Sequence, residues 1–320
     1  MTDQDGYDAL KRGLAAFKFP RDVVRVSGPE AERYLQGQLS QDVAALAPGA
    51  WAWALVLSPQ GKLDALVRVY RASADEFVLD TDAGTGPPLV ARLLRFRLRT
   101  KVEVEQLEWR AVAVRGPDAV SLWPSVAQAE DRVAVPFQWG GLAGYDLLGV
   151  RPVAPDDAVA VSQDDYEAVR IEAGFPRHGA ELDERTVPAE AGLVEASVSF
   201  TKGCYTGQEL VARIDSRGSN VPRHLRGLLL SGPAAAGEPL YRSRPGEPGS
   251  AGPPGEAGAE PAKEAGRLTS VALSPERGWV ALGYLGRAVT EGETLVVGGV
   301  PGSGTVRAEV RSLPLSSDGR

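Results

Sequence analysis

The chain has 320 residues, of which 43% are hydrophobic and 24% charged, enough apolar surface for a globular protein of two or three domains. Its formal net charge of −7 offers no overall basic face, which argues against a long nucleic-acid footprint. Its single cysteine excludes an internal disulfide framework and a zinc or iron–sulfur site built from several cysteines.

The N-terminal stretch MTDQDGYDALK lacks a basic region followed by an apolar run, so it does not resemble a secretory signal. No apolar run approaches the length needed to cross a bilayer. We therefore expect a soluble, cytoplasmic protein without a membrane partner. Direct nucleic-acid binding is not expected either.

Two segments of the chain resemble each other: VVRVSGPEAERYL (residues 23–35) and VAVRGPDAVSLW (residues 112–123). Each reads as a strand that enters Gly-Pro, then an acidic residue, and then a helical pattern. The similarity predicts two related α+β halves, with chance likeness of two strand-to-helix turns as the alternative.

The first half contains a predicted hairpin, WAWALVLSPQGKLDALVRVY, whose turn is Ser58-Pro59-Gln60-Gly61. A strand (EFVLDT), a short helix (PPLVARLLRF) and a strand (KVEVEQL) follow it. The basic run that ends this helix includes Arg92, Arg95, Arg97, Arg99 and Lys101. That run is either a solvated face or an anion site.

The second half repeats the pattern with the strands WRAVAV, RVAVPF and YDLLGV. The segment SQDDYEAVRIEAG is a predicted helix, because Ser162 is a suitable N-cap and Gly174 a suitable terminator. From about Val221 short glycine-separated strands predict a small β-barrel. We place the domains at residues 1–108, 109–221 and 222–320, with a flexible insertion at 243–266.

The lone cysteine lies in KGCYTGQE, residues 202–209. Thr206 and Glu209 form a predicted capping box, which would place Cys204 near the positive end of a helix with Lys202 beside it. Both influences favour the thiolate, the nucleophilic form of the side chain. The alternative is a small buried residue beside an N-cap.

Glu172, in VRIEAGFP, falls in the last turn of its predicted helix, where the helix dipole disfavours an anion. A carboxylate there suits two hydrogen bonds from a planar amino-amide heterocycle. Neutralisation by Arg170 or Arg177 is the alternative.

These motifs together resemble the YgfZ family of folate-binding proteins, which is related to the aminomethyltransferase of glycine cleavage. The resemblance rests on KGCYTGQE followed by LVAR, on RIEAGFPRHGAELDERTVPAEAGL, on YLQGQLSQDV, and on GRLTSVALSP and ALGYL near the C-terminus. It implies an α+β fold of duplicated mixed α/β halves in a ring-like body with a central folate channel, and a small C-terminal β-barrel.

The resemblance also implies tetrahydrofolate, or a one-carbon derivative of it, as cofactor. The implied partners are iron–sulfur client or assembly proteins, among them tRNA-modifying enzymes. The implied catalytic candidates are Cys204 and Lys202. The implied folate-binding candidates, which come from the same motifs, are Glu172, Arg170, Gln36, Gln38, Tyr205, Gln208 and Glu209; no metal-ligating residue is implied.

Two positions depart from the pattern of the relatives. Aminomethyltransferases carry paired aspartates in the first hairpin, and here Asp64 is followed by Ala65. Because successive strand residues face opposite ways, we expect Asp64 not to replace the missing second aspartate. Arg21 stands near a position where some relatives have a tryptophan beside the folate. The leading hypothesis is a folate-binding accessory factor, and the alternative is a folate-dependent aminomethyltransferase.

Overall fold

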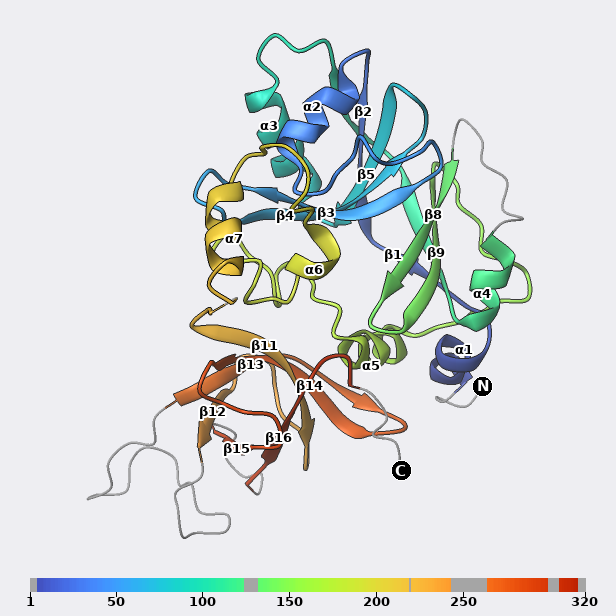
Figure 1. Cartoon of the computed structure of the whole chain (residues 1–320). Helices are drawn as coiled ribbons and strands as arrows, with labels where there is room; N and C mark the ends of the chain where they lie inside the picture. The colour runs from blue at the N-terminus through green and yellow to red at the C-terminus, as the bar shows by residue number, and fades with distance from the viewer. Residues whose placement is uncertain (1–4, 124–131, 219, 243–263, 299–304, 316–320) are drawn as a thin grey trace.

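The computed structural model describes residues 5–123, 132–218, 220–242, 264–298 and 305–315. In these residues, two five-stranded sheets and one closed six-stranded barrel form the framework (Figure 1). The barrel lies at one end of the molecule, and helix α5 (Gln163–Ala173) lies between it and the second sheet. The mixed α and β content and the C-terminal barrel confirm the predicted fold class.

The first sheet has the strand order β3–β4–β5–β2–β6 and contains the predicted hairpin as β3 and β4. Helices α2 (Ala31–Gln38) and α3 (Gly86–Phe96) pack against its apolar face, where Leu35 and Leu93 are fully buried. The strands of this sheet are β2 (Arg21–Ser27), β3 (Trp51–Leu57), β4 (Leu63–Arg71), β5 (Glu76–Asp82) and β6 (Glu103–Leu107).

The second sheet has the order β10–β1–β7–β9–β8 and takes a strand from the start of the chain. Strand β1 pairs with β7 antiparallel and with β10 parallel, beside helices α1 (Asp5–Arg12) and α4 (Pro117–Leu122). The expected first domain, residues 1–108, thus contributes a strand to the second sheet, although the boundaries themselves stay predictions. The strands are β1 (Ala15–Phe19), β7 (Arg110–Arg115), β8 (Arg132–Trp139), β9 (Leu142–Gly149) and β10 (Val159–Ala160).

Each sheet contains the repeated unit of strand, Gly-Pro and helix. Strand β2 leads through Gly28 towards α2, and β7 leads through Gly116 into α4; the two glycines have φ of 126° and 108°. A Cβ atom at Gly28 would lie 2.6 Å from the Lys101 carbonyl oxygen, and one at Gly116 would lie 2.2 Å from that of Gly13. Both turns therefore need glycine for the same two reasons, conformation and close backbone approach. This supports the interpretation of two related halves.

The barrel closes in the order β11–β14–β13–β12–β15–β16. Residues 243–263 of the predicted insertion lie outside the described residues, whereas Glu264 to Gly266 already belong to β13, so the insertion ends earlier than predicted. Strand β12 was not predicted. The barrel strands are β11 (Arg223–Leu230), β12 (Pro239–Arg242), β13 (Glu264–Ser274), β14 (Gly278–Gly286), β15 (Thr294–Val297) and β16 (Arg307–Arg311).

Helix α5 begins and ends as predicted. The Asp165 backbone N–H donates to the Ser162 hydroxyl at 3.1 Å, and Gly174 ends the helix in the left-handed conformation with φ 67°. The short helix α6 (Val194–Ser197) and helix α7 (Gln208–Asp215) follow before the barrel.

The predicted capping box before α7 is wrong. Gly207, with φ 81°, is the N-cap residue, and no side chain caps the helix. The Thr206 backbone N–H instead donates to the Gly37 carbonyl at 3.2 Å. A Cβ atom at position 207 would lie 2.5 Å from the Ser58 carbonyl oxygen, so contact with the hairpin turn requires a glycine at the start of this helix.

A chain of buried ion pairs joins the two sheets. Arg68 of β4 contacts Asp80 of β5 at 2.9 Å and Asp146 of β9 at 2.6 Å. Arg115 of β7 contacts Asp146 at 2.8 Å, and Arg21 contacts Asp80 at 2.7 Å. All five side chains are at most 3% exposed. The guanidinium of Arg21 is thus held by buried carboxylates.

Candidate functional site

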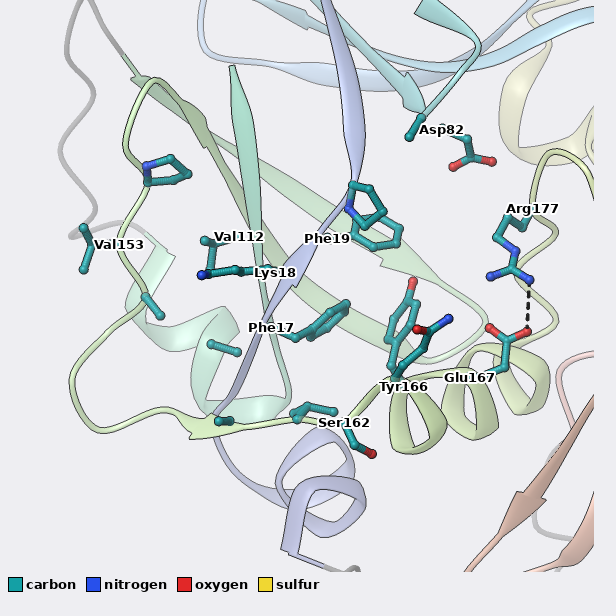
Figure 2. Close-up of a pocket in the computed structure, with 18 of the residues that line it drawn as sticks. Phe17, Lys18, Phe19, Asp82, Val112, Val153, Ser162, Tyr166, Glu167 and Arg177 are labelled. Atoms are coloured by element: carbon teal, nitrogen blue, oxygen red, sulfur yellow. Dashed lines mark ion pairs between the residues drawn. The ribbon is translucent and has the colours of Figure 1, made fainter. Parts of the chain in front are cut away.

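A cavity of about 790 Å³ is bounded by β1, β7 and α5 together with residues 152–154 and 177–178. Phe17 and Phe19 lie on the same face of β1, and their ring centroids are 4.3 and 5.4 Å from that of Tyr166 on α5. Figure 2 shows these three rings side by side. We call this space the aromatic cavity. Its volume is typical of pockets that hold small organic ligands.

The hydroxyl of Tyr166 has no partner in the described part of the chain, although the residue is only 6% exposed. Burial raises the pKa of Tyr166 to about 12, so the group is a neutral donor at physiological pH. In Figure 2 the hydroxyl points away from α5, towards the side of Phe19. A buried polar group without a partner is costly, and a ligand acceptor in the cavity would satisfy it.

Asp82, Glu167 and Arg177 lie at one side of the aromatic cavity, whereas Lys18 lines it beside Val112 (Figure 2). Asp82 accepts from the Arg21 guanidinium at 2.5 Å and from the His178 backbone N–H at 2.7 Å. Glu167 and Arg177 form an ion pair at 3.6 Å, drawn as the dashed line in Figure 2. The cavity therefore combines aromatic walls with a small polar side.

A second cavity, of about 690 Å³, lies beside the β3–β4 turn and α3. Arg92 donates to Asp64 at 3.1 Å and lies 3.8 Å from the centroid of the Phe96 ring. Burial raises the pKa of Asp64, and Arg92 only partly offsets this. We call this space the arginine cavity, because Arg92 and Arg95 both line it.

Position 65 does not face this cavity. Ala65 is 2% exposed and belongs to the apolar core under α2 and α3, whereas Asp64 lines the arginine cavity. The alternation along β4 thus gives the retained carboxylate, and not the replaced one, access to the cavity. Residues 64 and 65 thus face opposite ways, as expected, and whether Asp64 takes over the role of the missing aspartate stays a prediction.

Glu172 lies elsewhere, in a hollow of about 390 Å³ between α1, α5 and the barrel. Its carboxylate accepts hydrogen bonds from Tyr7 at 2.8 Å, Ser274 at 2.6 Å and Lys11 at 2.9 Å. An anion in the last turn of a helix is therefore stabilised by donors from three other segments. Neither Arg170 nor Arg177 is among the described partners of this carboxylate.

Arg170, another folate-binding candidate, is 1% exposed and is held by protein groups. Its guanidinium donates to Glu167 at 2.6 Å, to Glu181 at 3.1 Å and to Ser270 at 2.7 Å. The arrangement ties α5 to residue 181 and to strand β13. It leaves little donor capacity for a ligand.

The segment that contains the cysteine is tied to the C-terminal end of α2. The Lys202 ammonium donates to the backbone carbonyls of Gln36, Leu39 and Gln41 at 2.7, 2.7 and 2.9 Å. These bonds use all three of its donors, and burial lowers the pKa of Lys202 to about 8. Cys204 is exposed and lies four positions before the first helical residue, Gln208. The expected alternative of a buried cysteine is wrong.

The remaining candidates surround this segment rather than the aromatic cavity. Gln36 binds Asp42 and the backbone N–H of Val43, and Gln38 accepts from Arg92 at 3.0 Å. Tyr205 is 7% exposed and packs under the Lys202 ammonium, and Gln208 and Glu209 form the first turn of α7. Gln38, through Arg92, contacts a residue that lines the arginine cavity.

Sequence reasoning missed Phe17, Phe19 and Tyr166, which form the aromatic cavity. The available signal was the alternation in FKF, but it covers too few positions to predict a strand. Tyr166 stood inside a correctly predicted helix without any pattern that marked it as functional. These three rings come together only in the folded structure.

No group of three or more His, Cys, Asp or Glu side chains among the described residues could hold a metal ion. No helix in the same residues is long and apolar enough to span a membrane.

Residues 22–154 match the family model of the GCVT N-terminal domain. A mitochondrial iron-sulfur cluster assembly factor IBA57 homologue of Mycosarcoma maydis is 30% identical over 62% of this chain and 53% of its own length. The tRNA-modifying protein YgfZ of Escherichia coli is 29% identical over 62% of this chain and 66% of its own length. The chain thus spans less than two thirds of the length of these two relatives.

The solved structure of the glycine cleavage system aminomethyltransferase T from Bartonella henselae is similar in fold. It superposes with a TM-score of 0.79, covers 98% of this chain and 89% of its own, and is 21% identical. The likeness covers both sheets and the barrel, so the two proteins share one overall architecture.

Proposed function

Since the chain belongs to the YgfZ family, we propose that it is a tetrahydrofolate-binding accessory protein for the assembly or repair of iron–sulfur proteins, tRNA-modifying enzymes among them. The names of its relatives support the iron–sulfur role, and the aminomethyltransferase-like fold supports the folate. The observation that carries the proposal is the aromatic cavity with its unpaired buried hydroxyl.

The aromatic cavity fits the chemistry of a pteridine ring. Such a ring is flat and stacks on aromatic side chains, which Phe17 and Phe19 provide. Its carbonyl and ring nitrogens accept hydrogen bonds, and Tyr166 has a donor without a partner. These residues bind and orient the ring, while the one-carbon chemistry is supplied by the folate itself.

Replacing Tyr166 by phenylalanine is expected to weaken tetrahydrofolate binding about fivefold, since the variant loses one hydrogen bond worth about 1 kcal/mol. The free energy of unfolding should not fall and should rise slightly, because the hydroxyl is buried without a partner within the described residues. Isothermal titration calorimetry on folate-free protein measures the affinity. Tyr241→Phe, on barrel strand β12, is the matched control and should bind as the wild type does.

Glu172→Gln tests the other position for the ring. If the pteridine binds at Glu172, as the family resemblance implies, this variant weakens binding and Tyr166→Phe does not. If the ring lies in the aromatic cavity, Tyr166→Phe weakens binding and Glu172→Gln does not. An absence of heat for the wild type would instead favour a scaffold that has lost its ligand.

We propose a role for Cys204 as a reactive thiol or transient ligand, because the side chain is accessible and a lysine stands two positions away. The Lys202 ammonium is fixed by three carbonyls, so it acts through its field and not as a direct hydrogen-bond donor to sulfur.

Aminomethyl transfer in glycine cleavage is the alternative function, and one observation favours it. Asp64 lines the arginine cavity, and burial raises the pKa of its carboxyl group. Both properties suit a group that transfers protons to a substrate. We nevertheless expect no turnover with the aminomethyl-loaded lipoyl carrier protein and tetrahydrofolate. Formation of methylene-tetrahydrofolate by the wild type, lost in Asp64→Asn, would establish the alternative.

A further inference from the structure

The chain bends sharply where helix α3 ends at Phe96 and leads towards β6. We call residues 94–101, the end of this helix and the bend after it, the basic turn. The Thr100 backbone N–H donates to the Arg97 carbonyl at 3.0 Å, which closes a turn over residues 97–100. Leu98 is the second residue of this turn and has φ 51°. Left-handed backbone at this position favours glycine or asparagine, so a leucine is strained there.

Packing does not compensate for the strain at Leu98. Its side chain is 86% exposed, and Leu94, four positions earlier, is 43% exposed. Among the described residues, Leu98 is the one non-glycine residue with a positive φ. A large apolar side chain that is both strained and in contact with water adds little to the stability of the chain. It therefore points to a contact with another molecule.

Four cationic side chains accompany the two leucines. They are all exposed and are Arg95, Arg97, Arg99 and Lys101. Within the described residues they form no ion pair, although Arg97 donates to the Val102 carbonyl at 3.3 Å and Arg95 lies 5.8 Å from the Phe96 ring centroid. The basic turn thus has the opposite sign to the net charge of −7 of the whole chain, and its cations are available to carboxylates of another molecule.

The basic turn stands on a fixed base. Leu89 and Leu93 of α3 are buried in the core of the first sheet, and the Tyr34 hydroxyl donates to the Leu93 carbonyl at 2.5 Å. At the other end, the Lys101 backbone N–H donates to the Glu30 carboxylate at 2.8 Å. A surface segment that is fixed at both ends loses little conformational freedom when a partner binds to it.

We propose that the basic turn is the docking surface for an acidic protein partner, which receives Leu98 in an apolar depression and places carboxylates against the surrounding cations. The proposal rests on the proposed function, because the partner is an iron–sulfur client or assembly protein. An apolar anchor surrounded by a charged rim is the common anatomy of a protein interface. Arginine side chains, three of the four cations, pair with carboxylates in a directional way.

The composition of the basic turn favours a protein over other anionic partners. Surfaces that bind RNA stack bases on free aromatic rings, whereas the Phe96 ring already has the Arg92 guanidinium 3.8 Å from its centroid. Membrane attachment needs more apolar area than two leucines provide, and an anionic membrane would repel a chain with a net charge of −7. A few carboxylates on a protein match the short cationic segment.

Single variants test the docking surface through rescue of iron–sulfur enzyme activity in a strain that lacks this protein. Leu98→Asn removes the apolar anchor but suits the left-handed backbone, and Arg99→Glu reverses one exposed charge. We expect each variant, at equal protein level, to restore at most about a third of the activity that the wild type restores, with tetrahydrofolate affinity within about twofold of the wild type. Leu98→Asn should also raise the melting temperature, which a leucine with a structural role would not allow.

Leu273→Asn is the matched control, because this leucine is 58% exposed on barrel strand β13. It should rescue as fully as the wild type.

Photo-crosslinking in the same strain identifies the partner. A benzoylphenylalanine placed at position 98 is expected to form an adduct with one acidic protein, and the same group at position 273 is not. The protein identified by mass spectrometry is then purified and titrated against the full chain by calorimetry. Its Kd should rise about tenfold for Leu98→Asn and about fivefold for Arg99→Glu. Added salt should weaken binding to the wild type more than binding to Arg99→Glu.

The outcomes separate the two proposals. If the wild type neither rescues nor binds tetrahydrofolate, the proposed function fails and the docking surface fails with it. If the wild type and both variants rescue equally, the proposed function stands and the docking surface is overturned. Equal affinity of the cross-linked protein for the wild type and both variants would also overturn it. The same holds if the wild type binds total tRNA, or vesicles of phosphatidylcholine and phosphatidylglycerol, and Arg99→Glu does not, because the basic turn would then serve RNA or a membrane.

Discussion

Replacing Asp80 by alanine is expected to lower the free energy of unfolding by about 3 to 5 kcal/mol. The carboxylate accepts from Arg21 at 2.9 Å and from two nitrogens of Arg68 at 2.9 and 3.1 Å, and all of these groups are buried. Without this carboxylate, Asp146 is the carboxylate left to pair with both Arg68 and Arg115. The interior then keeps an uncompensated positive charge. Chemical denaturation followed by circular dichroism measures the loss.

Asp75→Ala is the matched control, because Asp75 is exposed in the turn just before the same strand. It should change stability by no more than about 0.5 kcal/mol. Burial raises the pKa of Asp80, but the guanidiniums of Arg68 and Arg21 lower it by more than burial raises it. The pKa of Asp80 is therefore lowered overall. Its contribution is therefore present at neutral pH and is lost only as the pH falls through that lowered pKa. A loss below about 1 kcal/mol for Asp80→Ala would show that the ion pairs add little stability.

Replacing Cys204 by alanine is expected to abolish rescue of iron–sulfur enzyme activity in a strain that lacks this protein, while tetrahydrofolate affinity stays within about twofold of the wild type. The thiol is exposed, so its removal takes no packing from the core and should cost less than about 0.5 kcal/mol of stability. Enzyme activity in cell extracts, with equal amounts of each variant, is the readout.

Cys204→Ser sharpens this experiment, since it keeps the size and polarity of the side chain but removes the sulfur nucleophile. It should fail to rescue in the same way. Full rescue by both variants would remove the cysteine from the mechanism and leave the folate site untouched. Lys202 is a poorer probe, because its ammonium holds three backbone carbonyls and its loss would disturb the whole segment.

Much of the fold could be predicted from the sequence where local signals were strong. The hairpin of β3 and β4, the caps of α5 and most barrel strands follow from alternation, turn residues and helix signals. Strands β1, β10 and β12, of five, two and four residues, were not predicted. Short strands like these are stabilised by hydrogen bonds to strands distant in the sequence. Such pairing produces no clear pattern in the local sequence.

The site was harder to predict for two physical reasons. The Thr206 and Glu209 pattern suits a capping box, but contact between Gly207 and the Ser58 carbonyl imposes a different start on α7. Likewise, Glu172 breaks the helix-dipole rule, and its partners Tyr7 and Ser274 come from the two ends of the chain. An anomaly of this kind indicates that a residue is constrained, not whether a ligand or the protein itself constrains it.

Strand β1 has a consequence for synthesis on the ribosome. Ala15 pairs with Arg115 on one side and with Val159 on the other, so the second sheet stays open until residues 159 and 160 have emerged. The first sheet uses residues 21–107 alone and is complete well before that. Strand β1 therefore has no partner strand until β7 has been synthesised, by which time every strand of the first sheet is available.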